Sequence, residues 1–514
     1  MTPAPTAPAD SSPPSISSDG AGTTGLVLRS AIVAALGGLL FGFDTAVISG
    51  TTESLSRVFD LSGFGLGFTV ATALIGTIIG ALLGGMPADR FGRKKVLYII
   101  GLLYIVSAVG SGLVSNWYLF MFFRFIGGLG VGAASVVAPV YTSEISPARI
   151  RGRLVGLVQF NVVLGILLAY LSNWVIAQLA SEQIAWRWML GAEAAPALVF
   201  FLLVFTVPES PRWLYTTGRY EESRHVLSLL TVSKKELLSE YAQIEQAEAA
   251  EADASGARLF APAHRRAILL AIAIAAFNQL SGINAILYYA PEIFRMTGAS
   301  GNTAMLQSVV VGIVNLLATM AGLSIIDRVG RRKLMLAGSI GYLISLGTVS
   351  ALFLGTGGDF TAGSSILVLV SVLVFIASHA FGEGAVIWVF ISEIFPNKVR
   401  GKGQALGGFV HWLFAALTSW TFPGIAASLG GGAAFLVFFA CMIGLLIWVL
   451  RIMPETKQVS LEHMAAALDS LKSDILFLQE VQGLHLGREA KLPDFPAAPH
   501  YDIIAERLDF HTSY

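Results

Sequence analysis

Charge and cysteine are scarce in this chain of 514 residues. Only 13% of the residues are Asp, Glu, Lys or Arg, and the formal net charge is zero, whereas soluble domains carry about 25% charged residues. No long basic run occurs, so the sequence does not support nucleic-acid binding. The single cysteine, Cys441, excludes a disulfide framework and a thiolate metal site. We expect no metal and no cofactor.

Apolar side chains are abundant instead. They make up 55% of the chain, and the mean hydropathy is +0.71. A membrane helix needs about 20 mostly apolar residues, and the sequence holds twelve such stretches, which predict an all-α membrane protein. The predicted spans lie near residues 28–49, 66–87, 96–114, 117–140, 154–176, 187–207, 265–290, 305–326, 334–354, 366–391, 403–424 and 432–452.

The spans divide the chain into two halves. Residues 1–25 are rich in Pro, Ala, Ser, Thr and Gly and lack a cleavable signal, so they predict a disordered tail. Residues 26–207 predict a first six-helix bundle and residues 265–455 a second. The charged segment 208–264 predicts a helical linker, and residues 456–514 predict a second tail.

A short basic motif occurs once in each half. Gly85-x-x-x-Asp89-Arg90-x-Gly92-Arg93-Lys94-Lys95 returns as Asp327-Arg328-x-Gly330-Arg331-Arg332-Lys333, each between two apolar stretches. One copy alone is equally well explained as a topology signal. Two copies at equivalent positions indicate duplicated helical halves, which are typical of alternating-access transporters.

The distribution of Lys and Arg predicts the orientation. These residues gather in the loops between spans 2 and 3, 4 and 5, 8 and 9, and 10 and 11. Basic loops stay in the cytoplasm. We therefore expect a multi-pass protein of the cell membrane with both termini inside.

Five ordered motifs resemble those of the sugar porters of the major facilitator superfamily. They are GGLLFGFDTAVISG at 37–50, RFIGGLGVG at 124–132, PESPRWL at 208–214, QLSGINAILYY at 279–289 and PETK at 454–457. The resemblance covers roughly residues 26–462. It implies the major facilitator fold, with two pseudo-symmetric six-helix bundles, and transport of a sugar by a lipid-embedded monomer.

Two ionisable residues, Asp44 and Arg124, fall well inside the first and fourth spans. A charge there costs about 2.5–3.5 kcal/mol on insertion scales, so such residues usually form ion pairs or take part in the function of the protein. A static ion pair is one interpretation. The other is a proton switch, in which Asp44 takes up a proton when Arg124 moves away. The resemblance implies the switch, because proton-coupled sugar porters carry this Asp facing this Arg.

A sugar-binding pocket needs amides, which both donate and accept hydrogen bonds, and aromatic rings for the C–H faces. Hydrogen bonds that only join helices are the alternative role for such side chains. The resemblance places sugar contacts at Gln159, Gln279 and Asn284, with Phe41 near the ring. The complete predicted set is Phe41, Gln159, Asn278, Gln279, Asn284, Tyr288, Glu383, Trp388, His411 and Trp412.

Three of these positions depart from the family pattern. Asn278 replaces the first Gln of a pair, Glu383 stands where a stacking Trp is common, and His411 takes the place of an amide. We expect Glu383 and His411 to form a polar pair, which is either a second proton-sensitive group or a satisfied structural contact.

Charged residues of the cytoplasmic loops predict a gate. Glu144 and Arg151 recur as Glu393 and Arg400 in similar surroundings. With Asp89, Arg93, Asp327 and Arg331 they predict a charged latch across the two bundles, and topology signals are the alternative. Exposed pairs are worth about 0–1 kcal/mol each, which suits a lock that opens in every cycle.

The last residues differ in character. The segment from Leu471 to Val481, with Glu480, resembles an early strand of the endonuclease/exonuclease/phosphatase family. One carboxylate cannot build that metal site, so we expect a fusion remnant or a plain extension and no enzyme activity.

The leading prediction is proton-coupled uptake of a monosaccharide, such as a hexose, pentose or related polyol. A facilitative sugar uniporter is the alternative, and a transporter-like nutrient sensor is a more distant one.

Overall fold

The computed structural model describes residues 20–147, 150–254 and 258–457. The regular structure within these ranges is helical, without strands. Twelve helical spans are long and apolar enough to cross a membrane, as the sequence predicted. Helix α1 starts at Gly20, so residues 20–25 of the predicted tail are helical. The endonuclease-like segment lies outside the described residues.

The first bundle contains six spans and three short helices. The spans are α1 (Gly20–Val47), α3 (Gly63–Leu83), α5 (Arg93–Leu113), α6 (Trp117–Ile145), α7 (Arg151–Leu179) and α8 (Glu182–Gly191) continued by α9 (Ala194–Val204). The short helices are η1 (Ile48–Gly50), α2 (Thr52–Val58) and α4 (Gly85–Phe91).

The second bundle repeats this plan after the linker. Its spans are α13 (Arg265–Leu280) continued by α14 (Ile283–Arg295), α15 (Gly301–Val329), α16 (Arg331–Thr356), α17 (Ala362–Phe381) continued by α18 (Glu383–Ile394), α19 (Arg400–Leu429) and α20 (Gly431–Arg451). Short helices η2 (Pro262–His264) and η3 (Asn397–Val399) precede α13 and α19.

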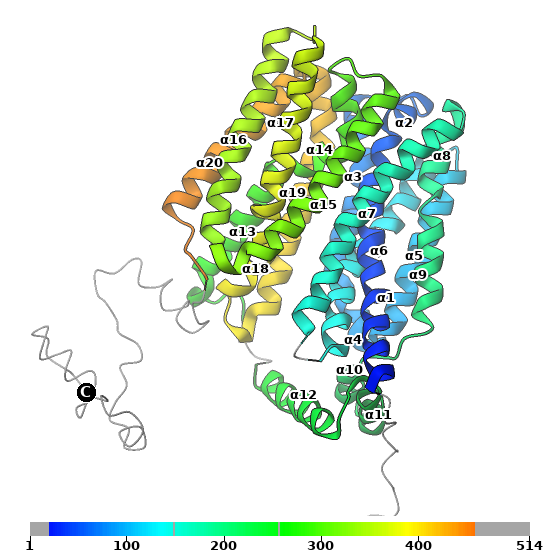
Figure 1. Ribbon diagram of the computed structural model, residues 1–514, viewed down its shortest axis with the longest axis vertical. Helices are drawn as coiled ribbons and strands as arrows, with labels where there is room; N and C mark the ends of the chain where they lie inside the picture. Colours follow the sequence, from blue (N-terminus) through cyan, green and yellow to red (C-terminus); the bar gives the residue numbers. More distant parts are fainter. Residues whose placement is uncertain (1–19, 148–149, 255–257, 458–514) are drawn as a thin grey trace, which may run out of the picture.

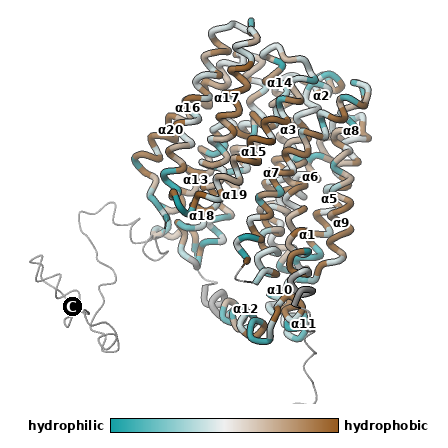
Figure 2. The backbone as a smooth tube through the Cα atoms, viewed as in Figure 1, coloured by the Kyte–Doolittle hydropathy of each residue, from teal (hydrophilic) through white to brown (hydrophobic). Residues whose placement is uncertain are grey.

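Three linker helices lie below the bundles in Figure 1: α10 (Pro211–Thr216) and α11 (Tyr220–Leu230) beneath the first bundle, and α12 (Lys234–Ala254) beneath the junction of the two bundles. The Ser210 side chain caps α10 by accepting from the Trp213 N–H at 3.1 Å. The bundle helices are mainly brown in Figure 2, whereas α11 and α12 carry teal polar residues. This contrast distinguishes the apolar spans from the linker.

Three of the twelve spans are interrupted. The sixth breaks beside Glu193, between α8 and α9, and the seventh breaks at Gly282, where φ is +86°. The tenth breaks at Gly382, between α17 and α18. Interrupted spans in transporters usually expose polar groups toward a central site. The three breaks are therefore candidate positions for a central polar site.

The two bundles contact each other on the side away from the linker. At Gly67 of α3 a Cβ atom would lie 1.9 Å from the Trp420 carbonyl oxygen of α19, so only glycine permits this approach. In a separate contact, the indole N–H of Trp174 donates to Asn302 Oδ1 at 3.0 Å, which joins α7 to α15. These contacts close the molecule on the side away from the linker (Figure 1).

Candidate functional site

A buried ion pair joins α1 and α6 at the centre of the first bundle. Arg124 Nη1 donates to Asp44 Oδ1 at 2.6 Å, and Nη2 donates to Oδ2 at 3.3 Å. Both residues are only 3% exposed. Such a pair is stable while both partners remain, but removing one leaves a costly unpaired charge. The arrangement can therefore sense whether Asp44 carries a proton.

A third charged residue, Glu193, was missed by the sequence analysis. It is buried at the break between α8 and α9 and interacts electrostatically with both Asp44 and Arg124. Its Oε1 atom has no hydrogen-bond partner among the described residues. Two carboxyl groups thus face one guanidinium, and a single proton neutralises the cluster. The signal was present, because an acidic residue inside an apolar span is a functional candidate by itself.

A small cavity adjoins the ion pair. It has an accessible volume of about 10 Å³, enough for roughly one water molecule. Asp44, Arg124 and Thr45 line it from the first bundle, and Tyr288 and Trp412 cover it from the second. The second bundle thus separates the carboxyl group from bulk solvent in this conformation.

Polar side chains of the second bundle meet beside this cover. Gln279 Nε2 donates to Asn278 Oδ1 at 2.9 Å and lies 3.2 Å from His411 Nε2. The Gln279 carbonyl Oε1 is buried and has no hydrogen-bond partner in the described part of the chain. A buried acceptor without a donor is unfavourable unless a ligand or water supplies the hydrogen. The amide is therefore available to a hydroxyl group.

Aromatic rings extend the same group across the bundle interface. Trp388 lies 5.1 Å from His411 between ring centroids, and His411 lies 4.9 Å from Trp412. Trp412 in turn contacts Phe41 of the first bundle at 5.6 Å. Phe41, His411 and Trp388 are partly exposed. The row offers ring faces of the kind that a sugar covers.

Two more predicted sugar contacts lie on the helices that border this row. Gln159 is half-buried on α7, and Asn284 is buried on α14, two residues after the break at Gly282. A Cβ at Gly282 would meet the Phe438 ring at 2.5 Å, so the break depends on glycine. The structure therefore places Asn284 at a discontinuity of its span.

Glu383 has a different partner from the one expected. It is 1% exposed, and its Oε2 atom accepts from the Tyr342 hydroxyl at 3.1 Å. His411 contacts Gln279 instead, so the expected Glu383–His411 pair is not formed. The break at Gly382 turns Glu383 toward α16, a change of direction that the sequence could not show.

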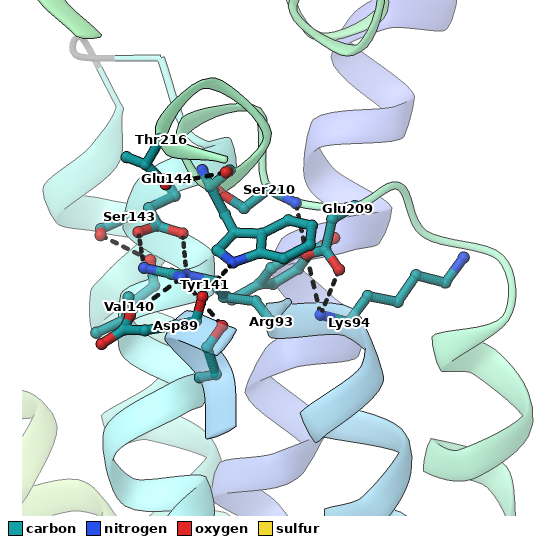
Figure 3. Close-up of polar contacts among 12 residues, drawn as sticks. Asp89, Arg93, Lys94, Val140, Tyr141, Ser143, Glu144, Glu209, Ser210 and Thr216 are labelled. Atoms are coloured by element: carbon teal, nitrogen blue, oxygen red, sulfur yellow. Dashed lines mark hydrogen bonds and ion pairs between the residues drawn. The ribbon is translucent and has the colours of Figure 1, made fainter. Parts of the chain in front are cut away.

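The predicted gate residues of the first bundle form a compact cluster, shown in Figure 3. Arg93 donates to both carboxylate oxygens of Glu144 at 2.9 and 3.0 Å and contacts Asp89 at 3.1 Å. Glu209 accepts from the Lys94 N–H at 3.1 Å. Burial raises the pKa of Glu209, while the N–H donors of Ser210 and Lys94 act in the opposite direction.

The second bundle repeats the cluster with equivalent residues. Arg331 donates to Glu393 Oε1 at 2.7 Å and to Asp327 at 3.0 Å. Glu455 accepts from the Arg331 N–H at 3.0 Å, as Glu209 does from Lys94. The duplicated motif therefore builds the same ion-pair geometry twice.

These pairs differ from the predicted ones. Glu144 pairs with Arg93, and Glu393 pairs with Arg331. The partners expected from the sequence, each seven residues further along the chain, were Arg151 and Arg400. Arg151 instead contacts Glu240 of the linker at 3.4 Å. Two guanidinium nitrogens of Arg400 are buried without a partner among the described residues. The eight predicted residues form no latch across the bundles here, because the bundles meet on the other side.

Comparison with known proteins identifies relatives along most of the chain. The sequence model of the family described as "Sugar (and other) transporter" matches residues 30–468. The chain is 38% identical over 471 residues to the D-xylose-proton symporter of Escherichia coli, covering 85% of this chain and 94% of that protein. It is 36% identical over 446 residues to the arabinose-proton symporter of Bacillus subtilis, with the same coverage of 85% and 94%.

Solved structures agree with the fold. The inward open conformation of the xylose transporter XylE from E. coli matches with a TM-score of 0.76 and 35% identity, covering 86% of this chain and 99% of that one. XylE bound to 6-bromo-6-deoxy-D-glucose matches with a TM-score of 0.71 and 35% identity, covering 87% and 100%. Two six-helix bundles in the major facilitator arrangement are thereby established.

Proposed function

The chain belongs to the sugar transporter family, and from this membership and the buried Asp44–Arg124 pair we propose that it carries a monosaccharide and protons together into the cell. The two bundles rock about the central site and expose it to one side at a time. The observation that carries the proposal is the carboxyl group of Asp44, 2.6 Å from Arg124 and sealed beneath the second bundle.

The ion pair supplies a physical reason for coupling. With Arg124 in place, the carboxylate of Asp44 is neutralised by a guanidinium. When the helices shift and the arginine withdraws, the buried carboxylate is stable only with a proton. Glu193 shares the same guanidinium and can hold the proton alternately with Asp44. Translocation then depends on proton uptake.

The amide and aromatic row beside this site supports a sugar as the co-transported solute. Gln279 offers an unpartnered acceptor, and Trp388, Trp412 and Phe41 offer ring faces. Gln159, Asn284 and Tyr288 belong to the same proposed site. Relatives are named for D-xylose, arabinose and glucose, so pentoses and hexoses are the first candidates.

Gate opening follows from the two ion-pair clusters. The outer contacts are made in this conformation, whereas the clusters of Arg93 and Arg331 stay within their own bundles. This arrangement corresponds to an inward-facing molecule. In the outward-facing state the unpartnered nitrogens of Arg400 are free to bind across the interface.

We place both termini and the linker in the cytoplasm, and we propose a monomer of two bundles, 26–207 and 265–455.

Liposome transport tests the proposal. A panel of labelled pentoses, hexoses and polyols is offered with and without an imposed pH gradient, first to the wild type and then to Asp44→Asn. We expect the variant to exchange sugar across the membrane but to lose accumulation against a gradient. Asp60→Asn is the matched control, because Asp60 is an exposed loop residue whose positive φ of 51° also suits Asn. Undiminished accumulation by Asp44→Asn would instead point to a uniporter or to another proton carrier.

A further inference from the structure

A second group of protonatable side chains lies inside the second bundle, away from Asp44. Tyr342 of α16 is fully buried, and its hydroxyl oxygen lies 2.6 Å from His379 Nδ1 of α17 and 3.1 Å from Glu383 Oε2 of α18. His379 and Glu383 lie on opposite sides of the break at Gly382. The three side chains, named here the Tyr342 cluster, thus bridge the two halves of the tenth span.

The two hydrogen bonds of the Tyr342 cluster require a hydrogen either on the Glu383 carboxyl group or on His379 Nδ1. Two contacts meet at the Tyr342 oxygen, but its hydroxyl supplies only one hydrogen. If Tyr342 donates to His379, then Glu383 must be protonated to donate to Tyr342. If Tyr342 donates to Glu383, then His379 must carry its hydrogen on Nδ1. With a neutral imidazole in both cases, the first arrangement holds one proton more than the second, so passing from one to the other takes up or releases a proton.

Within the ranges that the structure describes, no Lys or Arg forms an ion pair with Glu383. Its Oε1 atom is buried without a partner among the described residues. The titratable groups that face the cluster are Tyr342 of α16, His379 of α17 and His411 of α19. Helices α13 and α15, which also pack on α18, carry charged residues only at the ends near the linker: Arg265, Arg266, Asp327 and Arg328.

The cluster also adjoins the proposed sugar site. His411, which contacts Gln279, lies within electrostatic range of His379. Ser281, next to the break at Gly282 in the seventh span, interacts with Tyr342. The cluster therefore lies between both helix breaks of the second bundle, where a change of charge alters the positions of sugar-binding residues.

We propose that Glu383, Tyr342 and His379 form a second proton-binding site, and that proton binding there controls sugar affinity through the two helix breaks. This inference rests on the proposed transport of a sugar. It differs from the Asp44 site in its bundle and in its effect: Asp44 couples protons to translocation, whereas the Tyr342 cluster makes binding itself depend on pH.

The experiment separates the two sites by starting from the double variant Asp44→Asn/Glu193→Gln, in which neither acidic residue of the first site can titrate. D-Xylose binding to the purified protein is measured by calorimetry across a range of about pH 6 to pH 8, and D-glucose is the second probe. We expect the affinity of this double variant to change by about tenfold over this range. Adding Glu383→Gln should remove the pH dependence, and adding Tyr342→Phe should reduce it while leaving the carboxyl group in place.

An infrared measurement needs no sugar and gives an independent result. The pH-difference spectrum of the double variant Asp44→Asn/Glu193→Gln should contain a carboxylic-acid C=O band that Glu383→Gln removes. Glu292→Gln, a partly buried carboxyl on α14, is the control that should leave the band in place. A pH-dependent affinity and a C=O band that both persist in Glu383→Gln would overturn the inference. Undiminished accumulation by Asp44→Asn would overturn only the role proposed for Asp44.

Discussion

Arg295 at the end of α14 forms an ion pair with Glu53 of α2, and this pair links the two bundles on their outer side. Glu53 is half exposed, at 51%, and the Arg295 side chain is 22% exposed. An ion pair in such surroundings contributes only about 0.2–1 kcal/mol. It is thus weak enough to break in each transport cycle, and it joins the bundles in the conformation in which the side away from the linker is closed.

Removing this pair should favour the outward-facing state. In Glu53→Gln, we expect the ratio of outward-facing to inward-facing molecules to rise by up to about fivefold, which corresponds to a pair worth about 1 kcal/mol. Spin-label distances between the outer ends of α3 and α19 measure the ratio. Glu182→Gln is the control, because Glu182 pairs with Arg57 inside the first bundle at 2.7 Å. Equal distance distributions in Glu53→Gln and wild type would count against a latch.

The conformation of Gly330 leads to a prediction about stability. Its φ of 99° and ψ of 156° lie in a region that is nearly restricted to glycine, and Gly92 adopts almost the same angles. A Cβ at Gly330 would lie 2.7 Å from Glu455 Oε2. We expect Gly330→Ala to destabilise the protein by at least about 1–3 kcal/mol, seen as a lower melting temperature in detergent.

Gly401→Ala provides the comparison for this variant, since a Cβ at Gly401 meets no atom within 4 Å and its position is helical. Glu455→Gln tests the partner, whose carboxylate accepts from the N–H groups of Arg331 and Arg332 at 3.0 and 3.1 Å. Loss of this charge at a helix N-terminus should cost about 0.3–1 kcal/mol. If Gly330→Ala and Gly401→Ala both melt at the wild-type temperature, the backbone at Gly330 is not strained by a Cβ atom.

The sequence predicted the number of spans because span length and hydropathy are local properties. The sequence also predicted that ion pairs form in the cytoplasmic loops, but it assigned the wrong partners to Glu144 and Glu393. Glu144 and Arg151 share a loop, but the helix entered at Arg93 brings a different guanidinium closer to Glu144. Partner choice depends on how helices far apart in sequence cross, and no spacing rule contains that information.

The same limit applies inside the bundles. Glu193 and His379 stand in apolar spans and could have been singled out by their charge or titration alone. Their partners depend on the helix breaks at Glu193 and Gly382. Glu193 lies beside Asp44, and His379 contacts Tyr342. The substitution at Asn278 is accommodated because its shorter amide still accepts from Gln279.

Glu193→Gln should weaken coupling without abolishing transport. The variant keeps the size of the side chain but leaves Arg124 with one carboxyl partner, so the proton is held by Asp44 alone. We expect accumulation driven by a pH gradient to fall by about tenfold, equivalent to roughly 1.4 kcal/mol, while sugar exchange at equal pH is retained. Asp60→Asn serves as the control, because Asp60 is an exposed loop residue outside the proton site and the gate clusters. Accumulation equal to wild type would remove Glu193 from the proton pathway.

Gln279→Ala should impair sugar binding more than any other single change in the polar row. The carbonyl Oε1 of Gln279 is buried without a partner among the residues that the structure describes, and its amide nitrogen joins Asn278 to His411. Truncation therefore removes one hydrogen bond to the sugar and leaves two neighbours unsatisfied, which together cost about 1–3 kcal/mol. The expected result is a KM for uptake raised about tenfold or more, with the maximal rate changed little.

His411→Gln introduces the amide that the resemblance to sugar porters implies at this position and is the informative companion of Gln279→Ala. It should keep the contact with Gln279 but lose part of the tilted ring contact with Trp388, now 5.1 Å between centroids. We expect a changed preference among pentoses and hexoses at similar overall affinity, measured by competition in liposomes. Gln307→Ala is the control, because Gln307 of α15 also has a buried, unpartnered oxygen but lies outside the row. If Gln307→Ala raised the KM as much as Gln279→Ala, binding could not be assigned to the row.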